Sequence, residues 1–492
     1  MRNIHKLMLL LVVFLMINFD LQAKESGPPQ KPNVLFIIVD DLNDWLSCMN
    51  GHPQAFTPNI DRLAARGLLF TNAHCQAPLC GPSRTSLFFG MRPSSSGVYA
   101  NFPKEYKKIS TLQNIESMPA YFGACGYDTL ATGKIFHNGY EPNPNQTEFQ
   151  IAGPYDTGKI PFGPYPPNKL HVFDTFGGNL AAYDWGFPYN SDEETLDHAF
   201  TTWAIEQIRK PREKPFFLGV GLIKTHFPHF ASKNYQKQYP LEKIQLPPIL
   251  ETDLDDVPEF GRAINRAPAT PTYNWIKANN ALPEMVQAYL ACVTMVDKQV
   301  GRLLDALDSS GKSESTIVVF TADNGFHRGE KQQVEKWTLW NRSTRVPLII
   351  ASPIGKRGLE CQQPVELLDI YPTLVDLCGL SMNPSLEGTS LRNELQDPHQ
   401  KRDRPAITTW YPNNHSVQTT LWHYIRYADG TEELYDKKND PNEWNNLAGT
   451  EPARPVVSEL IRWLPTSRLP VPGSDYNAVP QVVRNRSDWI KE

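Results

Sequence analysis

Several apolar runs in this chain stop at acidic or amide side chains, and this pattern constrains the fold more than any other feature. The run NVLFIIV stops at Asp40 and Asp41, and STIVVFTA stops at Asp323 and Asn324. Apolar, β-branched runs of this length are typical of strands buried in a parallel sheet. The carboxyl ends of such strands meet at one edge, where ligands bind. We therefore predict a mixed α/β domain with a site at that edge.

Two more predicted strands end in a lysine with a histidine close behind it. YDTLAT is followed by Lys134 and His137, and PFFLGVGLI is followed by Lys224 and His226. A helical turn would place Lys134 and His137 on one face. Alternation along a strand end would place Lys224 and His226 on one side. A single histidine is more often structural, but two such pairs at strand ends favour catalytic roles.

The acidic strand ends have the chemistry of a site for a hard cation. Three carboxylates and one amide oxygen suit Ca²⁺ or Mg²⁺ and do not suit a thiolate zinc site. For Asp40 and Asp41 alone, helix capping or simple termination of a strand is an equal alternative. Their combination with Asp323, Asn324 and Cys80 favours the metal site.

The five residues Cys80-Gly81-Pro82-Ser83-Arg84 precede TSLFFGM and predict a loop that opens a helix. Pro82 presets φ for a first helical turn and Ser83 is a favourable cap. Backbone N–H groups would then point at the group that Cys80 carries, a geometry that suits an anion. The alternative is a small buried cysteine before an ordinary helix.

The string Cys-x-Pro-Ser-Arg resembles the maturation signature of the type I sulfatases, in which a separate enzyme oxidises the cysteine to formylglycine. Further matching strings are NVLFIIVDDL, TPNIDRLA, GKIFHNG, VGLIKTHFPH, TADNG and the ending D-P-x-E-x-x-N-L. Within the family the chain is most similar to iduronate-2-sulfatase-like enzymes, although Asn324 stands where those carry histidine. The resemblance implies an alkaline-phosphatase-like fold: a large mixed sheet flanked by helices, and a smaller C-terminal α+β subdomain with a small antiparallel sheet.

The resemblance also implies a role for each matching residue. The metal ligands would be Asp40, Asp41, Asp323, Asn324 and the modified Cys80. The catalytic residues would be Cys80, Arg84, which holds the formylglycine, and Lys134, His137, His226 and Lys336, which contact the sulfate or the nucleophile. The implied cofactors are one Ca²⁺, or Mg²⁺, and the formylglycine. The implied partners are a sulfated oligosaccharide or polysaccharide and a formylglycine-generating enzyme.

The order of segments predicts export and two domains. Arg2 and Lys6, an apolar run and a small-residue site predict a signal peptide over 1–23. The run is too short to span a bilayer, so we expect a periplasmic or secreted protein (lysosomal or extracellular in a eukaryote), with no membrane segment after signal removal. A membrane anchor or a buried helix is the alternative. Residues 140–184 predict a long irregular loop. A change in composition divides the remainder into a catalytic domain, 31–380, and a C-terminal subdomain, 381–492.

Charge and motifs together favour one function and leave two alternatives. A net charge of -5 argues against a nucleic acid partner. We expect a sulfatase that hydrolyses sulfate esters of a sulfated saccharide, with a 2-O-sulfated uronic acid as one candidate. The enzymatic alternative is a phosphonate or phosphate monoester hydrolase of the same superfamily. The other alternative is a protein with an unmodified Cys80 that binds sulfated glycans without turnover.

Overall fold

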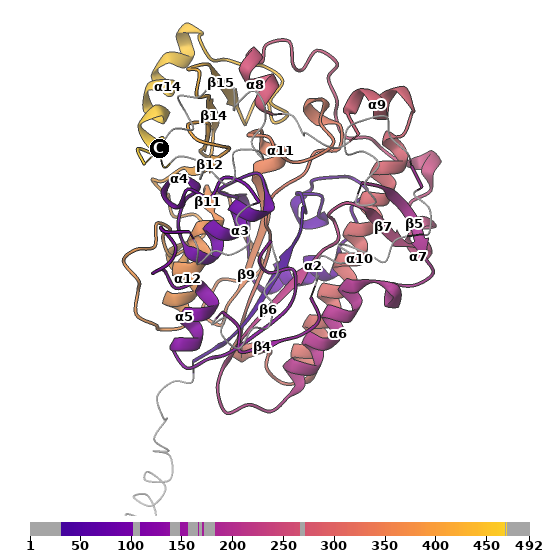
Figure 1. The fold of residues 1–492 in the computed structure, drawn as a ribbon, viewed down its shortest axis with the longest axis vertical. Coiled ribbons are helices and arrows are strands. Elements are labelled where there is room, and N and C mark those ends of the chain that lie inside the picture. The colour runs from indigo at the N-terminus through magenta and orange to yellow at the C-terminus, as the bar shows by residue number, and fades with distance from the viewer. Residues whose placement is uncertain are drawn as a thin grey trace, which may run out of the picture. The chain divides into compact units, whose positions relative to one another are not determined.

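A mixed β-sheet between two groups of helices organises the chain (Figure 1). The computed structural model describes residues 31–101, 109–137, 148–155, 166, 170–171, 183–265, 271–467 and 469. The predicted signal peptide, 1–23, lies outside these residues, as does most of the predicted loop 140–184. From Asn33 onward the chain belongs to one unit, and the description below concerns this unit.

The main sheet has nine strands among the described residues, in the order β10-β2-β9-β8-β1-β6-β3-β4, with β11 paired to β2. Their bounds are β1 Asn33–Val39, β2 Leu68–His74, β3 Asp128–Gly133, β4 Ile151–Ala152, β6 Phe216–Leu222, β8 Thr316–Ala322, β9 Arg345–Ala351, β10 Leu359–Cys361 and β11 Val365–Glu366. The central strands β8, β1, β6 and β3 are parallel, whereas β9 runs antiparallel to β8 and β2. Val39 is in register with Leu222 and Ala322, so three strands end side by side.

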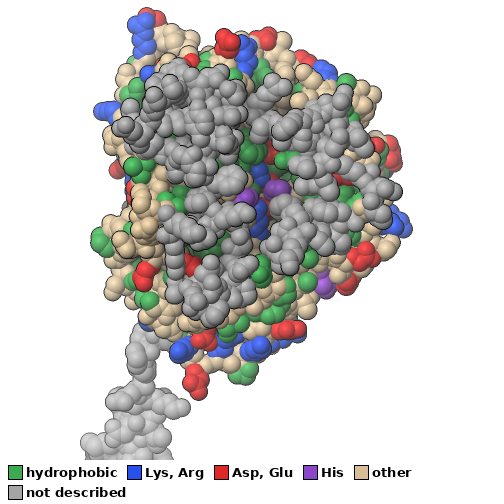
Figure 2. Space-filling view, in the orientation of Figure 1, with side chains coloured by type: hydrophobic (Ala, Val, Ile, Leu, Met, Phe, Trp, Pro, Cys, Tyr) green, Lys and Arg blue, Asp and Glu red, His purple; other side chains and the backbone are tan. Residues whose placement is uncertain are grey.

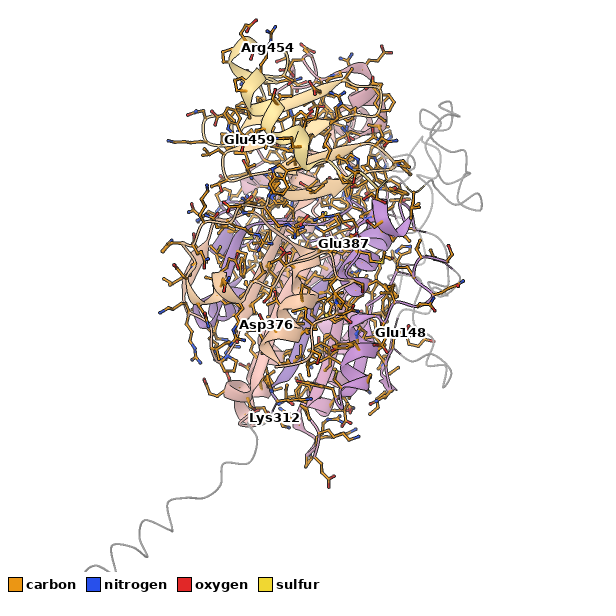
Figure 3. All side chains as sticks on the ribbon, turned by 90° about the vertical axis from the view of Figure 1, so that its left-hand side faces the viewer. Glu148, Lys312, Asp376, Glu387, Arg454 and Glu459 are labelled. Carbon is orange, nitrogen blue, oxygen red and sulfur yellow. The ribbon has the colours of Figure 1, made fainter. Side chains whose placement is uncertain are left out.

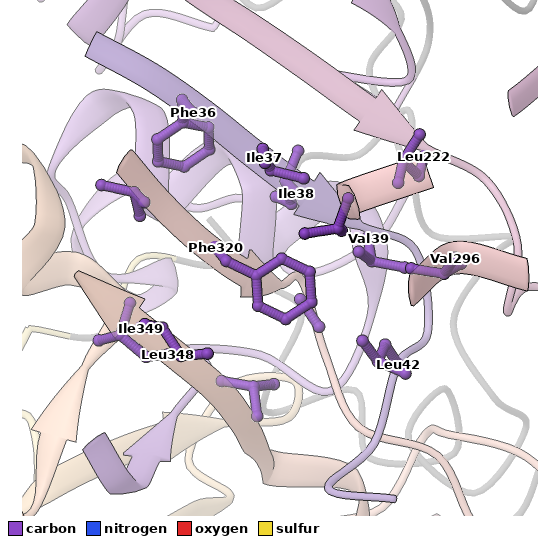
Figure 4. Packing of buried hydrophobic residues seen from close by; sticks show 14 of the residues in the cluster. Phe36, Ile37, Ile38, Val39, Leu42, Leu222, Val296, Phe320, Leu348 and Ile349 are labelled. Atoms are coloured by element: carbon purple, nitrogen blue, oxygen red, sulfur yellow. The ribbon is translucent and has the colours of Figure 1, made fainter. Parts of the chain in front are cut away.

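The centre of the sheet is buried on both faces, as the apolar runs predict. Residues 34–39 of β1 have no exposed surface. Figure 4 shows Phe36, Ile38 and Val39 close to side chains of neighbouring strands, including Phe320 of β8 and Leu222 of β6. Burial of apolar surface of this kind is the largest favourable contribution to the free energy of folding.

Helices cover both faces of the main sheet. The long amphipathic helix α10 (Leu282–Ser309) packs with α2 (Pro58–Arg66) and α6 (Leu196–Arg209), while α3 (Cys80–Phe89) packs with α5 (Met118–Ala124) and α12 (Ile370–Leu377). The other α-helices among the described residues are α4 Pro93–Ser96, α7 Lys233–Gln236, α8 Glu259–Ile264, α9 Tyr273–Ala278, α11 Asn341–Thr344, α13 Arg392–Gln396 and α14 Arg454–Leu460. No helix within the described ranges is both long and apolar enough to cross a bilayer.

Two smaller sheets complete the fold. An antiparallel sheet in the order β12-β13-β14-β15 is built from Ala406–Thr409, His415–Gln418, Trp422–Arg426 and Glu432–Asp436. Its last two strands form a hairpin at Asp429-Gly430, where Gly430 has φ 94°. Strands β5 (Trp185–Tyr189) and β7 (His229–Ser232) form a parallel pair. Figure 3 shows Arg454 and Glu459 of α14 at the end of this view opposite Lys312, which precedes β8.

The fold class is confirmed, and some local predictions are wrong. Helix α3 begins at Cys80 with Leu79 as its extended N-cap residue, so Ser83 is not a cap; its hydroxyl donates to Asp323 O at 2.5 Å. Strand β11 and a short turn, Leu367–Asp369, precede helix α12, and Arg92 binds the Glu366 carboxylate of β11. The four-stranded sheet falls within 381–492, and the domain limits themselves stay predictions.

Candidate active site

The ends of β1 and β8 bring four predicted residues into one buried cluster. Asp40 and Asp41 follow β1, and Asp323 and Asn324 follow β8; all four are 0% exposed. The backbone N–H of Asp41 donates to Asp323 Oδ1 at 3.0 Å, and Asn324 Nδ2 donates to Asp41 Oδ1 at 2.9 Å. The strand ends therefore meet as the sequence predicts.

Asp41 has a backbone conformation that its neighbours must support. Its φ of 60° is left-handed, which is uncommon for a residue other than glycine. The Tyr289 hydroxyl, from α10, donates to Asp41 O at 2.9 Å and accepts from Asn43 N at 3.0 Å. This arrangement turns the Asp41 carboxylate into the cluster. The sequence predicts only a packing role for Tyr289, since an aromatic residue on an apolar helix face gives no other signal.

Three basic side chains neutralise the three carboxylates. Arg84 Nε donates to Asp323 Oδ2 at 2.8 Å, and Lys134 Nζ donates to Asp40 Oδ2 at 2.5 Å. Lys336 Nζ lies 2.6 Å from each oxygen of Asp41. The remaining Arg84 bonds include one to Ile135 O at 2.9 Å, which fixes the guanidinium against the chain after β3.

Both lysines keep their charge in this setting. Burial alone would lower the pKa of Lys134 and of Lys336, but the carboxylates of Asp40 and Asp41 outweigh it and hold each pKa above its usual value. Three positive and three negative side chains leave the cluster neutral, so a divalent cation would make it positive and suited to an anionic ester.

Cys80 lies at the centre of these groups, at the first residue of α3. Its Sγ is 3.7 Å from Asp41 Oδ1 and 3.1 Å from Lys336 Nζ, and the residue is 1% exposed. Burial and the charge of Asp40 raise the pKa of the thiol well above its usual value, against the opposing effect of the lysines. As an unmodified residue, Cys80 is therefore a protonated thiol and a weak nucleophile.

The two predicted catalytic histidines lie beside the cluster. His226 Nε2 is 3.6 Å from Asp41 Oδ2, and its Nδ1 faces Phe227 O at 2.6 Å. Burial, then Lys336, lowers the pKa of His226 to about 4. Burial and Lys134 hold the pKa of His137 well below its usual value. Basic and histidine side chains gather in a hollow near the centre of the face shown in Figure 2.

Lys224 does not join this group, and the predicted pairing with His226 is wrong. The strand β6 ends at Leu222 and the chain turns at 224–226, so the two residues do not alternate along a strand. Lys224 Nζ donates to Pro228 O at 3.2 Å and lies 5.9 Å from the ring centres of Tyr189 and Phe230.

A buried carboxylate that the sequence prediction missed stands next to Lys336. Glu335 Oε2 accepts from Trp337 Nε1 at 3.0 Å and from the backbone N–H of Lys336 at 3.1 Å. Burial raises the pKa of Glu335 to about 7. In the sequence, its position directly before Lys336 is the one feature that points to Glu335 as a residue of the site.

The cluster fits a hard divalent cation. One donor atom from each of Asp40, Asp41, Cys80 and Asp323 lies within 4.8 Å of the other three. Within the described part of the chain, Asn324 Oδ1 is buried and has no hydrogen-bond partner, as expected for an oxygen reserved for a ligand. Carboxylate and amide oxygens are what Ca²⁺ and Mg²⁺ prefer.

Known structures share this architecture across nearly the whole chain. A sulfatase, BT4656, solved in complex with its substrate D-glucosamine-2-N,6-O-disulfate, superposes with a TM-score of 0.69 and 20% identity, over 94% of this chain and 100% of that one. The phosphonate monoester hydrolase SpPMH from Silicibacter pomeroyi gives 0.71 and 19%, over 94% and 96%. At this identity the likeness shows the fold alone, which is alkaline-phosphatase-like.

Sequence comparison identifies the family to which the chain belongs. The sulfatase family model matches residues 32–380, and the model for the C-terminal region of N-sulphoglucosamine sulphohydrolase matches 329–468. A sulfatase of Formosa agariphila is 38% identical, over 98% of this chain and 96% of its own; human iduronate 2-sulfatase is 34% identical, over 74% and 72%. The chain therefore belongs to the type I sulfatase family, and it is a sulfuric ester hydrolase.

Proposed function

We propose that this protein is an exported sulfatase that removes sulfate from a sulfated saccharide by means of a formylglycine made from Cys80. The observation that carries the proposal is the place of Cys80: its Sγ lies between Lys336 Nζ and an Asp41 oxygen, inside a cluster of three carboxylates. A protonated thiol in this position has little reactivity of its own. The surrounding groups are better explained by an oxygen nucleophile at position 80.

Asp40, Asp41, Asp323 and Asn324 would hold a Ca²⁺ ion, or Mg²⁺, together with the modified residue 80. A bound divalent cation supplies positive charge that polarises the sulfate and lowers the pKa of a coordinated hydroxyl. The orphaned Asn324 Oδ1 and the neutral balance of the cluster support this assignment. Arg84 keeps Asp323 and Asp40 in place through its bonds to both carboxylates.

The remaining residues bind charge and move protons. A hydrated formylglycine supplies one hydroxyl that attacks sulfur and a second whose deprotonation releases sulfate. Lys134 and Lys336 would neutralise the sulfate oxygens as preorganised charges. His137, held as a neutral imidazole, is suited to accept the proton of the second hydroxyl.

His226 would donate the proton to the departing sugar oxygen. With its pKa near 4, the imidazole is neutral at pH 7 before substrate binds. An anionic ester bound beside the ring would raise that pKa, because a nearby negative charge favours the protonated form. Substrate binding and protonation of His226 would therefore occur together.

The substrate and the location of the enzyme are also part of this proposal. The names of two relatives, iduronate 2-sulfatase and Δ4,5-hexuronate-2-O-sulfatase, support a 2-O-sulfated uronic acid or a related oligosaccharide. The N-terminal sequence supports export to the periplasm or outside the cell. Maturation would need a formylglycine-generating enzyme as a partner.

Peptide mass spectrometry across Cys80, on protein from its native source, tests the nucleophile directly. We expect the aldehyde or its hydrate, and sulfate release from a panel of sulfated oligosaccharides. A free thiol in protein that still releases sulfate would overturn the mechanism. A free thiol in protein that only binds these oligosaccharides would favour the glycan-binding alternative.

A further inference from the structure

The segment that carries Lys336, residues 327–341, has a backbone that needs external support. Lys331, Gln332 and Trp337 have φ values of 53°, 51° and 80°, all left-handed. Non-glycine residues keep such conformations only where surrounding contacts determine them, and they gather at functional sites. The contacts that hold this segment therefore bear on where Lys336 lies.

Part of that support is internal to the Lys336 segment. The Arg328 guanidinium donates to His327 O at 2.9 Å and to Val334 O at 3.1 Å, which closes the segment on itself. It also lies 4.2 Å from the ring centre of Tyr289 and 4.1 Å from that of Phe326. The two hydrogen bonds fix the shape of the segment, and the ring contacts hold the guanidinium from outside it.

External support comes from several groups: Pro78 O accepts from Trp337 N at 3.2 Å, and Asn265 Oδ1 accepts from Leu339 N at 3.0 Å. A further part comes from Glu443, in the C-terminal part of the chain. Glu443 Oε2 accepts from Asn341 N at 3.0 Å, and Glu443 O accepts from Lys331 Nζ. These two contacts lie on either side of Lys336 in the sequence. Lys331 Nζ also pairs with Asp253 at 2.6 Å. One buried residue thus joins the segment on both sides of the lysine.

Glu443 is the glutamate of the D-P-x-E-x-x-N-L string, and the rest of the string holds it. Asp440 caps the turn by accepting from Trp444 N at 3.0 Å and Asn445 N at 2.8 Å. Asn446 Oδ1 accepts from Leu434 N at 3.0 Å, which ties the turn to β15. Glu443 itself has a left-handed φ of 61°. The hydrogen bonds of this motif therefore fix the position of the Glu443 carboxylate.

The second oxygen of that carboxylate is also occupied. His423 Nδ1 bonds Glu443 Oε1, and His423 Nε2 bonds Ser416 Oγ at 2.7 Å. These are the residue types of a hydrolytic triad, but Ser416 and His423 are 0% exposed, so no substrate reaches them. Their function is to orient the Glu443 carboxylate toward Asn341.

We propose that Glu443 is a positioning residue for Lys336, and that through it the C-terminal subdomain completes the active site. This inference rests on the proposed function, since Lys336 is the group being placed. Lys336 must meet both Asp41 oxygens and the group at position 80, within 2.6 and 3.1 Å. A small shift of the segment would break this geometry, and misplacement by about 1 Å can cost roughly a hundredfold in rate.

The test is a double-mutant cycle between Glu443→Ala and Lys336→Ala, measured with an activated aryl sulfate. We expect Glu443→Ala to lower kcat/KM roughly 10- to 100-fold in the native background. In the Lys336→Ala background it should lower kcat/KM by no more than about twofold, because coupled residues are not additive. Glu443→Gln should retain most activity, since an amide can accept from Asn341 N and donate to His423.

The matched control is Val417→Ala, which removes apolar contacts from the same small sheet, where Val417 is fully buried. It should lower Tm and leave kcat/KM per folded molecule unchanged. If Glu443→Ala has normal activity while Lys336→Ala has lost activity, this inference is wrong and the proposed function stands. The same holds if Glu443→Ala lowers kcat/KM equally in the native and the Lys336→Ala backgrounds. Full activity of Lys336→Ala would overturn the role of Lys336 in the proposed function, and this inference with it.

Discussion

In the proposed mechanism, residue 80 supplies the nucleophile, so a substitution at Cys80 tests that mechanism directly. Replacement by serine keeps nearly the same volume in a site where the side chain is 1% exposed, so Cys80→Ser should fold with an unchanged Tm. It should lose turnover at saturating substrate, because a serine sulfate ester has no second hydroxyl with which to expel sulfate. Thermal melting and sulfate release check both parts.

Another cysteine provides the control for this substitution. Cys48 is half-buried near Asp61 and has no contact with the carboxylate cluster among the described residues. Cys48→Ser should therefore retain full turnover. Full activity of Cys80→Ser under the same conditions would show that the aldehyde is not the nucleophile.

Most residues of the site could be predicted because their signal is local. Two apolar runs end at polar residues, Asp40 and Asp41 in one case and Asp323 and Asn324 in the other. Such an ending can be recognised from the sequence alone. Tyr289 and Glu335 could not be predicted in this way. Tyr289 has the ordinary pattern of a helix face, and its hydroxyl meets Asp41 O only through tertiary packing.

At the scale of elements, Asp44 ties the loop after β1 to the elements at the start of β9. Its carboxylate accepts from Arg342 and, at 2.9 Å, from Arg345. Burial alone would raise the pKa of Asp44, but the two arginines outweigh it and hold the pKa below its usual value. The ion pair therefore favours the folded state whenever Asp44 is ionised.

Asp44→Asn should lower the free energy of unfolding at pH 7 by roughly 1 to 3 kcal/mol, because it removes a carboxylate that two partly buried guanidinium groups share, although Arg342 keeps its pair with Glu330 at 3.0 Å. The pKa of Asp44 is lower in the folded protein than in the unfolded chain. The stabilisation is therefore present above the unfolded pKa of about 3.9 and is lost as the pH falls below that value toward the folded pKa. Urea unfolding of both proteins at pH 7 and at decreasing pH measures this gap.

The exposed pair of Arg62 and Asp305 is the comparison for this prediction. Its side chains are 34% and 66% exposed, so Asp305→Asn should change stability by less than about 1 kcal/mol. A gap between wild type and Asp44→Asn that stays constant from pH 7 to pH 3 would contradict the electrostatic explanation.

Long elements could be predicted and short ones could not, for one physical reason. Strands β1, β6 and β8 have seven residues each, and all of these except Asn33 are buried, so their composition identifies them. Strands β7 and β13, with the sequences HFAS and HSVQ, have no apolar run. Their pairing depends on partners elsewhere in the chain, which a local pattern does not contain.

At the scale of the whole molecule, the candidate cation site joins segments that are far apart in sequence. Asp41 and Asp323 are separated by 282 positions and share a direct hydrogen bond. The fold that brings them together also occurs in a phosphonate monoester hydrolase, so the chemistry depends on side chains at the strand ends rather than on the sheet. A ligand bound only by the folded arrangement must stabilise the whole unit.

Removal of divalent cations should therefore lower both activity and stability. Chelation should abolish sulfate release and lower Tm, and added Ca²⁺ at a hundredfold excess over its Kd should restore about 2.7 kcal/mol of stability. Calorimetric or fluorescence melting over a Ca²⁺ titration measures this directly. The cluster is neutral without the ion, because Arg84, Lys134 and Lys336 balance its three carboxylates, so the protein should remain folded after chelation.

Asn324→Ala tests whether the Asn324 side chain binds the cation or whether the cation only screens the charges of the carboxylates. The variant removes the Oδ1 that has no protein partner in the described chain, and it leaves all three carboxylates and all three basic groups in place. We expect the Ca²⁺-induced rise in Tm to shrink and the concentration needed for half-maximal activity to increase at least tenfold. If the cation acted only by screening the carboxylates, the variant would respond to Ca²⁺ as the wild type does, and the assignment of the site would fall.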